Sequence, residues 1–148
     1  MRILIVSDTH GKVQRVYDIY KKLTKDSPID LIVHCGDYAD DGLEIQKHLG
    51  KRVLWVKGNC DGCFDEKEYA ILETEAGSFF VCHGHMQNIG YSKQDLYYYA
   101  LQEDCIGAIY GHTHRADKLP RRAPPDARSR PASTPARSAG TPGQRGRR

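Results

Sequence analysis

Residues 1–11 read MRILIVSDTHG, a short apolar run rich in β-branched residues that stops at a polar turn. A run of this length predicts a buried strand over 2–7, which the turn Asp8-Thr9-His10-Gly11 brings to an end. Apolar residues then recur at three- and four-residue spacing, which predicts an amphipathic helix along Val13, Val16, Ile19, Tyr20 and Leu23. The stretch therefore predicts the strand–loop–helix unit of an α/β protein.

The same unit is repeated further along the chain. Two more apolar runs, at 30–35 and 53–56, are each followed by a glycine and a polar residue. Between them, Leu43, Ile45 and Leu49 indicate a helix that Gly50 closes. Strand, helix, strand, helix, strand is the order of a parallel sheet.

After residue 68 the pattern changes. Residues 69–74 and 78–82 flank the turn residues 75–77, which predicts a β-hairpin. Ser92 is a candidate N-cap for a helix, and 106–110 is a further apolar run that predicts a strand. The second part of the chain is therefore expected to be a mixed arrangement rather than a further parallel repeat.

Polar side chains follow the expected strands directly, and ligand sites of α/β sheets gather at the carboxyl ends of their strands. The seven candidate metal ligands are Asp8, His10, Asp37, Asn59, His83, His112 and His114. Mixed oxygen and nitrogen donors suit Mn²⁺, Fe²⁺, Zn²⁺ or Ni²⁺. Seven donors are too many for one ion and suit two ions, roughly 3.5–4 Å apart, that share a carboxylate.

At these positions the chain resembles the calcineurin-like metallophosphoesterases, and most of all their small, capless microbial phosphodiesterase branch. The resemblance covers about residues 1–118 and rests on five motifs in family order: Asp8-Thr9-His10, Gly36-Asp37, Gly58-Asn59, His83-Gly84-His85 and Gly111-His112-Thr113-His114. It implies an α/β fold in which a β-sandwich of two mixed sheets is flanked by helices in αββα layers.

The same resemblance implies an activity and a role for each ligand. Asp8, His10 and His114 would hold the first ion, Asn59, His83 and His112 the second, and Asp37 would bridge them. The implied reaction is hydrolysis of phosphodiesters, or activated phosphomonoesters, by a hydroxide that the two ions activate. Mn²⁺ is the expected metal, with Ni²⁺, Fe²⁺, Zn²⁺ and Co²⁺ as alternatives.

Two departures from the family pattern affect these expectations. Cys60 stands where much of the family has a catalytic histidine, so the general acid is unassigned and His85 is one candidate. Relatives add further strands after Gly-His-Thr-His, whereas this chain has a Pro/Arg-rich ending. We therefore expect a shortened domain over 1–118 with an incomplete second sheet, and a disordered tail over 119–148.

Each motif also has a simpler interpretation. Asp8-Thr9-His10 alone could cap a helix, and the Gly-Asp and Gly-Asn pairs could be ordinary turns. We expect His34 to be a hydrogen-bonded core residue and not a ligand. Cys60-x-x-Cys63 resembles half a zinc site or a redox pair, but no second such pair accompanies it. A phosphoesterase loop is the favoured interpretation.

Composition and charge narrow the remaining classes of function. The net charge of +3 hides a contrast, because the eight arginines and one aspartate after residue 118 give that segment +7 and leave −4 for the rest. We do not expect the basic tail to bind nucleic acid. The five cysteines fit reduced thiols and a cytoplasmic location. No apolar run is long enough to span a membrane. The sequence leaves open whether the chain forms a homo-oligomer. A non-catalytic interaction scaffold and an inactive shortened product are the alternative functions.

Overall fold

The computed structural model describes residues 1–62 and 67–115, which form two three-stranded sheets with three helices. The first sheet is wholly parallel, in the order β1-β2-β3, and helices cross from each strand to the next. Its elements are β1 (Ile3–Val6), α1 (Gln14–Leu23), β2 (Leu31–His34), α2 (Ala39–Leu49) and β3 (Val53–Trp55). The predicted parallel strand–helix repeat is confirmed.

The second sheet is mixed, in the order β4-β5-β6. The predicted hairpin is present, since β4 and β5 pair antiparallel, and β6 pairs parallel to β5 after a crossover through α3. The elements are β4 (Tyr69–Thr74), β5 (Gly77–Cys82), α3 (Gln94–Gln102) and β6 (Gly107–Tyr110). Neither sheet closes on itself within the described residues.

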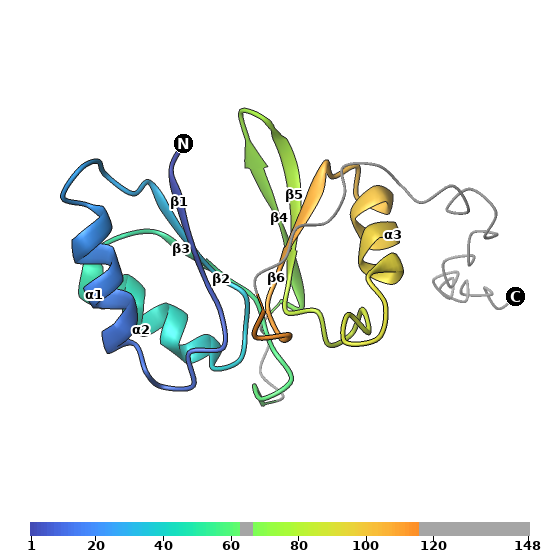
Figure 1. Cartoon of the computed structure of the whole chain (residues 1–148), viewed down its shortest axis with the longest axis horizontal. Coiled ribbons are helices and arrows are strands. Elements are labelled where there is room, and N and C mark those ends of the chain that lie inside the picture. The colour runs from blue at the N-terminus through green and yellow to red at the C-terminus, as the bar shows by residue number, and fades with distance from the viewer. Residues whose placement is uncertain (63–66, 116–148) are drawn as a thin grey trace, which may run out of the picture.

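The two sheets face each other, with α1 and α2 outside the first and α3 outside the second (Figure 1). Three apolar clusters correspond to these layers. The central cluster joins the sheets through Leu31, Val33, Cys35, Val56, Leu72 and Val81. One outer cluster packs α1 and α2 on the first sheet, and the other packs α3 on β5 and β6. The predicted helix-flanked pair of sheets is therefore confirmed, except that the first sheet is parallel and not mixed.

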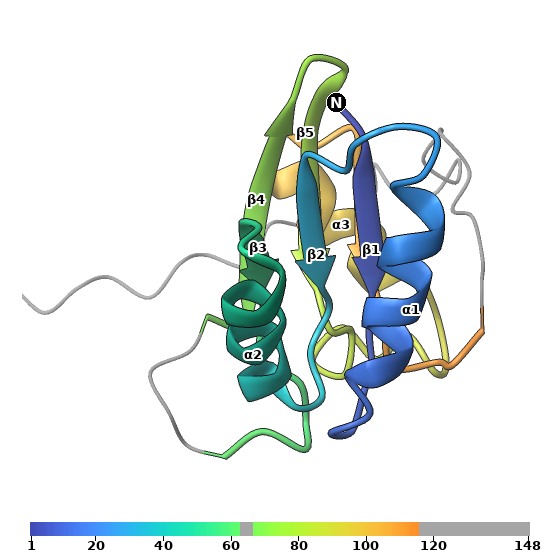
Figure 2. The same ribbon diagram turned by 90° about the vertical axis from the view of Figure 1, so that its left-hand side faces the viewer.

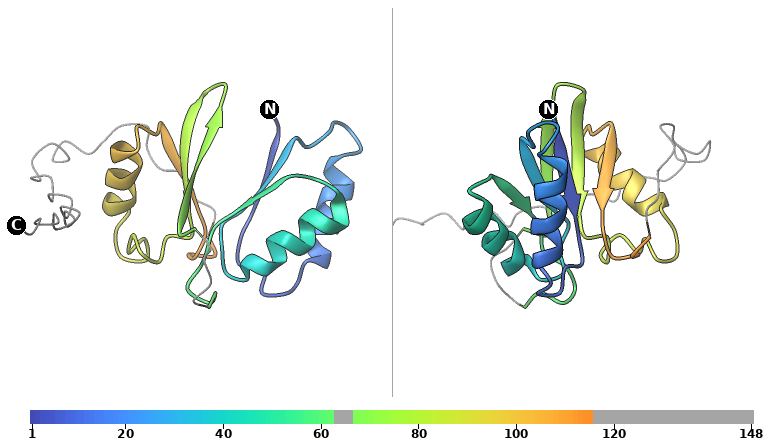
Figure 3. Two further views of the ribbon diagram at one scale, coloured as in Figure 1. Left: turned by 180° about the vertical axis from the view of Figure 1, so that it is seen from behind. Right: turned by 60° about the vertical axis from the view of Figure 1, so that its left-hand side comes forward.

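Strands β1, β2, β5 and β6 end at the same edge of the molecule, as the view onto the first sheet and the views from behind and from the side show (Figures 2 and 3). β2 is buried along its whole length because it lies between β1 and β3. Because the strands stop together, the polar turns that follow them meet at one place between the sheets.

Local differences from the predicted elements have physical causes. Helix α2 begins at Ala39, four residues before the first apolar position of the expected pattern, because Asp61 Oδ1 accepts a hydrogen bond from the Ala39 amide at 2.8 Å. Helix α3 begins at Gln94, and the hydroxyl of Ser92 accepts a hydrogen bond from the Gln94 amide at 3.1 Å. The tail expected to be disordered, 119–148, and the cysteine Cys63 lie outside the described residues.

None of the helices within the described ranges has the length and apolar character that crossing a bilayer requires.

Candidate metal centre

The turns that follow the strands hold several non-glycine residues in the left-handed backbone region. This conformation is uncommon for residues with a Cβ and costs of order 1–3 kcal/mol each, so it persists where the surrounding structure enforces it. Five of the seven candidate ligands adopt it: Asp8 at φ 55°, His10 at 47°, Asp37 at 55°, His112 at 66° and His114 at 52°. The concentration of this strain at one edge of the sheets makes that edge the candidate functional site.

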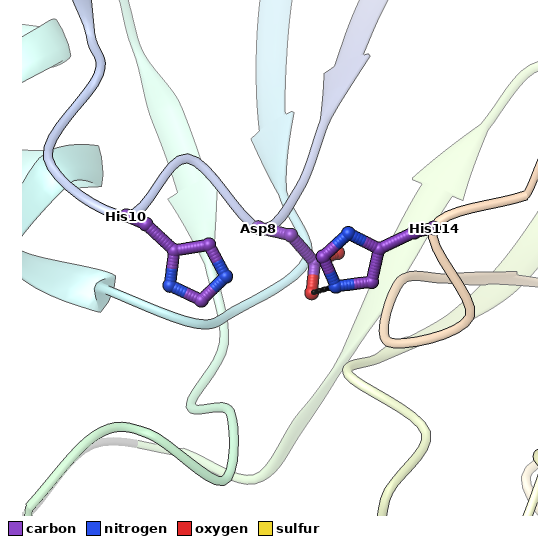
Figure 4. Close-up of side chains that lie close together, drawn as sticks. All are labelled: Asp8, His10 and His114. Atoms are coloured by element: carbon purple, nitrogen blue, oxygen red, sulfur yellow. Dashed lines mark ion pairs between the residues drawn. The ribbon is translucent and has the colours of Figure 1, made fainter.

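Asp8, His10 and His114 form the first group of donors (Figure 4). One ligand atom from each lies within 4.8 Å of the others, and His114 Nε2 lies 3.4 Å from Asp8 Oδ1. The two imidazole rings stack with their centroids 6.1 Å apart. Residues from the first and last turns of the described chain thus meet around one carboxylate.

His83 lies at the centre of a second group. Its Nε2 is 3.4 Å from Asp37 Oδ1, 4.0 Å from Asp8 Oδ1 and 3.1 Å from Asn59 Oδ1. Its Nδ1 lies 2.7 Å from the carbonyl oxygen of Cys35, an acceptor to which only a protonated Nδ1 can donate. In the neutral ring, Nε2 then presents a lone pair toward three oxygens. A cation, or a second proton on the ring, resolves this repulsion, and a metal ion suits the donor set.

Asp8 supplies an independent sign that this site suits a cation. Its Oδ1 is buried and has no hydrogen-bond partner, while its Oδ2 accepts from the backbone amide of His112 at 3.1 Å. A buried carboxylate oxygen without a partner is costly, because its desolvation is not compensated. A divalent ion between Asp8 and the surrounding imidazoles would compensate it, so the residues present fit a metal.

His112 is placed less directly than the other candidates. Its ring lies 5.0 Å, centroid to centroid, from the ring of His83. In the described part of the chain it does not join the three groups of His, Cys, Asp and Glu donors that converge within 4.8 Å. Its backbone amide contacts Asp8, so the residue belongs to the same cluster of side chains.

Two glycines allow the turns to approach so closely. A Cβ on Gly58 would collide with Oδ1 and the backbone nitrogen of Asp37, and a Cβ on Gly111 would collide with the Ser7 hydroxyl. Both glycines precede a candidate ligand, Asn59 and His112. The Gly-Asn and Gly-His pairs of the sequence are therefore required by close packing around the site and are not only turn formers.

The electrostatics of Asp37 keep its carboxylate ionised. Burial alone would raise its pKa, but the hydrogen bond from the Cys60 amide at 2.9 Å and the nearby His83 outweigh burial and hold the pKa below its ordinary value. The Cys60 thiol in turn has a raised pKa because it donates a hydrogen bond to Asp37. Burial lowers the pKa of His85, whose Nδ1 is buried without a partner.

A hydrogen-bonded chain behind the site links its two aspartate-bearing turns. Gly36 N–H donates to His34 Nδ1 at 3.2 Å, which leaves His34 Nε2 as the donor to Thr9 Oγ1 at 2.7 Å. The Thr9 hydroxyl then donates to Asp41 Oδ2 at 2.6 Å, and the Gly11 amide donates to the same oxygen at 2.8 Å. His34 is fully buried, so its predicted role as a hydrogen-bonded core residue is confirmed.

Asp41 and Asp61 are the supporting residues that the sequence pattern did not single out. Asp41 is 5% exposed although it lies in the first turn of α2, and Asp61 Oδ2 accepts from the Gly58 amide at 2.7 Å. Asp61 stands within the motif Gly58-Asn59-Cys60-Asp61, which was the available signal. No comparable signal marked Asp41, because acidic residues in the first turn of a helix are common on exposed surfaces.

Comparison with known proteins decides the family. The model of the calcineurin-like phosphoesterase superfamily domain matches residues 1–124. The chain belongs to this superfamily. Membership in this superfamily accounts for a cluster of carboxylates and imidazoles at the strand ends.

Sequence relatives include the probable metallophosphoesterase YsnB of Bacillus subtilis, 33% identical over 116 residues. That match covers 78% of this chain and 66% of the relative. The probable metallophosphoesterase MJ0623 of Methanocaldococcus jannaschii is 37% identical over 120 residues, covering 77% of this chain and 59% of the relative. The matches thus span about two thirds or less of these relatives' lengths.

Solved structures share the fold. A predicted phosphoesterase from Streptococcus pneumoniae TIGR4 superposes with a TM-score of 0.59 at 28% identity, covering 76% of this chain and 62% of that one. Wild-type Vps29 from Entamoeba histolytica, complexed with Zn²⁺, superposes with a TM-score of 0.63 at 22% identity, covering 79% and 67%. The Vps29 likeness concerns the fold alone.

Proposed function

We propose that this metallophosphoesterase hydrolyses phosphodiesters, or activated phosphomonoesters, with the help of two divalent metal ions. The single observation that carries the proposal is the convergence of carboxylate and imidazole donors on Oδ1 of Asp8, a buried atom that accepts no hydrogen bond. Small phosphoesters are the substrates that such a centre at an open strand edge accommodates. The proposed domain is residues 1–118, and its four described free cysteines fit the proposed cytoplasmic location.

We propose the following division of ligands. Asp8, His10 and His114 hold one ion, Asn59, His83 and His112 hold the other, and Asp37 bridges them. The grouping of Asp8 with His10 and His114 supports the first set. The contacts of His83 with Asn59 and Asp37 support the second, and its distance to Asp8 is short enough for the two ions to share one cluster. Mn²⁺ is the proposed metal because all seven proposed donors are hard oxygens or borderline nitrogens.

When bound, such ions polarise phosphoryl oxygens and lower the pKa of water to near neutrality. The protein's own contribution is orientation and charge. The carbonyl of Cys35 fixes the His83 ring, and the Cys60 amide fixes the Asp37 carboxylate. The charge of Asp37 and the fixed orientation of both side chains would determine where a phosphoryl group can lie.

The test is hydrolysis of a chromogenic aryl phosphodiester by the full chain, with Mn²⁺ added to protein that has been stripped with chelator. We expect turnover that depends on Mn²⁺ and that exceeds turnover of the matching aryl phosphomonoester. A cooperatively folded sample without turnover in Mn²⁺, Ni²⁺ or Co²⁺ would contradict the proposal. A higher rate on the monoester would show that phosphomonoesters are the preferred substrates, without contradicting metal-dependent hydrolysis.

The second candidate function is a non-catalytic interaction scaffold, and the fold likeness to Vps29 is the observation in its favour. Metal analysis separates the two candidates. A folded chain that retains fewer than one ion per molecule after incubation with Mn²⁺ and gel filtration would favour the scaffold, whereas stoichiometric metal with turnover favours the enzyme.

A further inference from the structure

Cys60 occupies a position at the metal centre that the proposed ligand set does not use. Its sulfur, a ring nitrogen of His10 and a carboxylate oxygen of Asp37 all lie within 4.8 Å of one another. This is a third converging group of donors, beside the two that contain Asp8. It differs from them in offering sulfur in addition to nitrogen and oxygen.

The position of the sulfur is fixed by the site itself. The Cys60 backbone amide donates to Asp37 Oδ1 at 2.9 Å, and the Asn59 side-chain amide donates to the sulfur at 3.4 Å. The sulfur thus lies within 4.8 Å of an Asp37 carboxylate oxygen, close enough for one cation to contact both atoms.

Donor chemistry then predicts which cations this corner of the centre prefers. Thiolate sulfur is a soft ligand that selects Zn²⁺ over Mn²⁺, and Zn²⁺ is commonly bound by Cys, His and carboxylate donors in a tetrahedral site. Cys60 is exposed, so a fourth position at this corner is open to water or to a phosphoryl oxygen. Loss of the thiol proton to solvent accompanies formation of the sulfur–metal bond.

We propose that Cys60 is a sulfur ligand to a cation held with His10 and Asp37, and that it shifts the metal preference of the centre toward thiophilic ions such as Zn²⁺ and Co²⁺. The inference rests on the proposed two-metal function, since His10 and Asp37 belong to that centre. It also gives the residue that replaces the family histidine a role other than general acid.

Cobalt substitution tests the proposal without relying on activity. Co²⁺ added to the metal-free full chain should give d–d bands in the visible range and, in addition, a thiolate-to-cobalt charge-transfer band in the near ultraviolet. The charge-transfer band should disappear in Cys60→Ser while the d–d bands persist. Cys63→Ser is the matched control, because it removes a second thiol three residues away, and it should keep both features.

A metal-competition experiment measures how strongly Cys60 favours Zn²⁺ over Mn²⁺. Cys60→Ser should lower the apparent affinity for Zn²⁺ at least about tenfold, the lower bound for loss of a group that supports a metal, and change Mn²⁺ affinity far less. An equal fall in affinity for Zn²⁺ and Mn²⁺ would overturn the proposal.

The spectra separate this inference from the proposed function. Bound Co²⁺ without a charge-transfer band in the wild-type chain, or a band that survives Cys60→Ser, overturns the sulfur ligand and leaves the two-metal site standing. A chain that binds no Co²⁺, Zn²⁺ or Mn²⁺ overturns both proposals together.

Discussion

The two sheets contribute different chemistry to one site. The turns after β1, β2 and β3 supply all the oxygen donors, namely Asp8, Asp37 and Asn59, with His10 as their only imidazole. The turns after β5 and β6 supply imidazoles alone: His83, His112 and His114. The first half therefore supplies the carboxylates and the second half most of the imidazoles, so the proposed two-ion site needs both halves.

The halves also differ in how their turns are held. Behind the first sheet, Asp41 and Asp61 accept hydrogen bonds from backbone amides of three different turns, and His34 joins two of them. On the second sheet, His83 is anchored by a bond across to the Cys35 carbonyl of the first. The turns of the first half are therefore held by hydrogen bonds within that half, whereas His83 of the second half is held by a hydrogen bond to the first. Each prediction below alters one side of this contrast.

The largest effect is expected from Asp37→Asn. The substitution removes the charge that we propose bridges the ions and leaves Cys60 and His83 in place. Loss of several kcal/mol of electrostatic stabilisation corresponds to a fall in kcat/KM of about a thousandfold or more. Steady-state kinetics on the aryl phosphodiester checks it, and an activity within tenfold of the wild type would show that Asp37 is not the bridge.

His83→Ala and His114→Ala should separate folding from metal binding on the second sheet. His83 is fully buried and bonded to Cys35, so its truncation leaves a cavity and an unpaired carbonyl, and should lower the free energy of unfolding by about 2–5 kcal/mol. The His114 side chain is 63% exposed, so its truncation should change that free energy by less than about 0.5 kcal/mol.

Both histidine variants should nevertheless lose metal-dependent activity. The measurements are urea unfolding of metal-free protein and hydrolysis with saturating Mn²⁺. Equal destabilisation by the two substitutions would contradict the view that His83 joins the halves and His114 only completes the site.

Asp41→Asn tests the support of the first sheet. Asp41 contacts no candidate metal position directly, but its carboxylate holds Thr9 and Gly11 on either side of His10. We expect Mn²⁺ affinity to fall by about 10–100-fold, as for other groups that orient metal ligands. Calorimetric titration measures this, with Asp40→Asn, an exposed neighbour on the same helix, as the control. Unchanged affinity in a destabilised Asp41 variant would reduce its role to folding.

The smallest effect concerns pH. Burial lowers the pKa of His34 below its ordinary value of 6.5, so the unfolded chain binds this proton more readily than the native one. Stability should therefore be fully present above about pH 6.5 and fall as the pH drops below it, by at most about 1.4 kcal/mol per pH unit from this residue.

Unfolding free energies of the metal-free chain between pH 7.5 and 5.5 check this sign. His34→Gln should flatten the dependence relative to the wild type. His85 contributes in the same direction, so a residual slope in His34→Gln is expected. An identical slope in the wild type and His34→Gln would contradict the assignment.

Much of the first half was predictable because local patterns determine it. The short β-branched run before Asp8 is typical of a buried strand. Gly36 and Gly58 mark the points where two turns approach each other closely. The hairpin at 69–82 was equally readable. These features depend on neighbours in sequence, so a single chain reveals them.

What the sequence left open depends on contacts between distant residues. The early start of α2 follows from Asp61, which lies 22 residues beyond Ala39. The buried Asp41 has the sequence context of an exposed helix residue, and only its bonds to the distant Thr9 and Gly11 explain its burial. The order of the motifs along the sequence was enough to propose which residues bind metal. The position of the His112 ring, 5.0 Å from the ring of His83, depends instead on how the two sheets face each other.

The unequal exposure of His83 and His114 has a consequence for the order in which an ion would be captured. A cation arriving from solvent meets the His114 imidazole at the rim before it reaches the enclosed ring of His83. The His83 ring is already held by its bond to the Cys35 carbonyl, so capture would begin at the exposed His114 side chain without any opening of the sheets. Exchange of metal should therefore be much faster than unfolding, and the residence time of the ion would be set at the surface of the molecule.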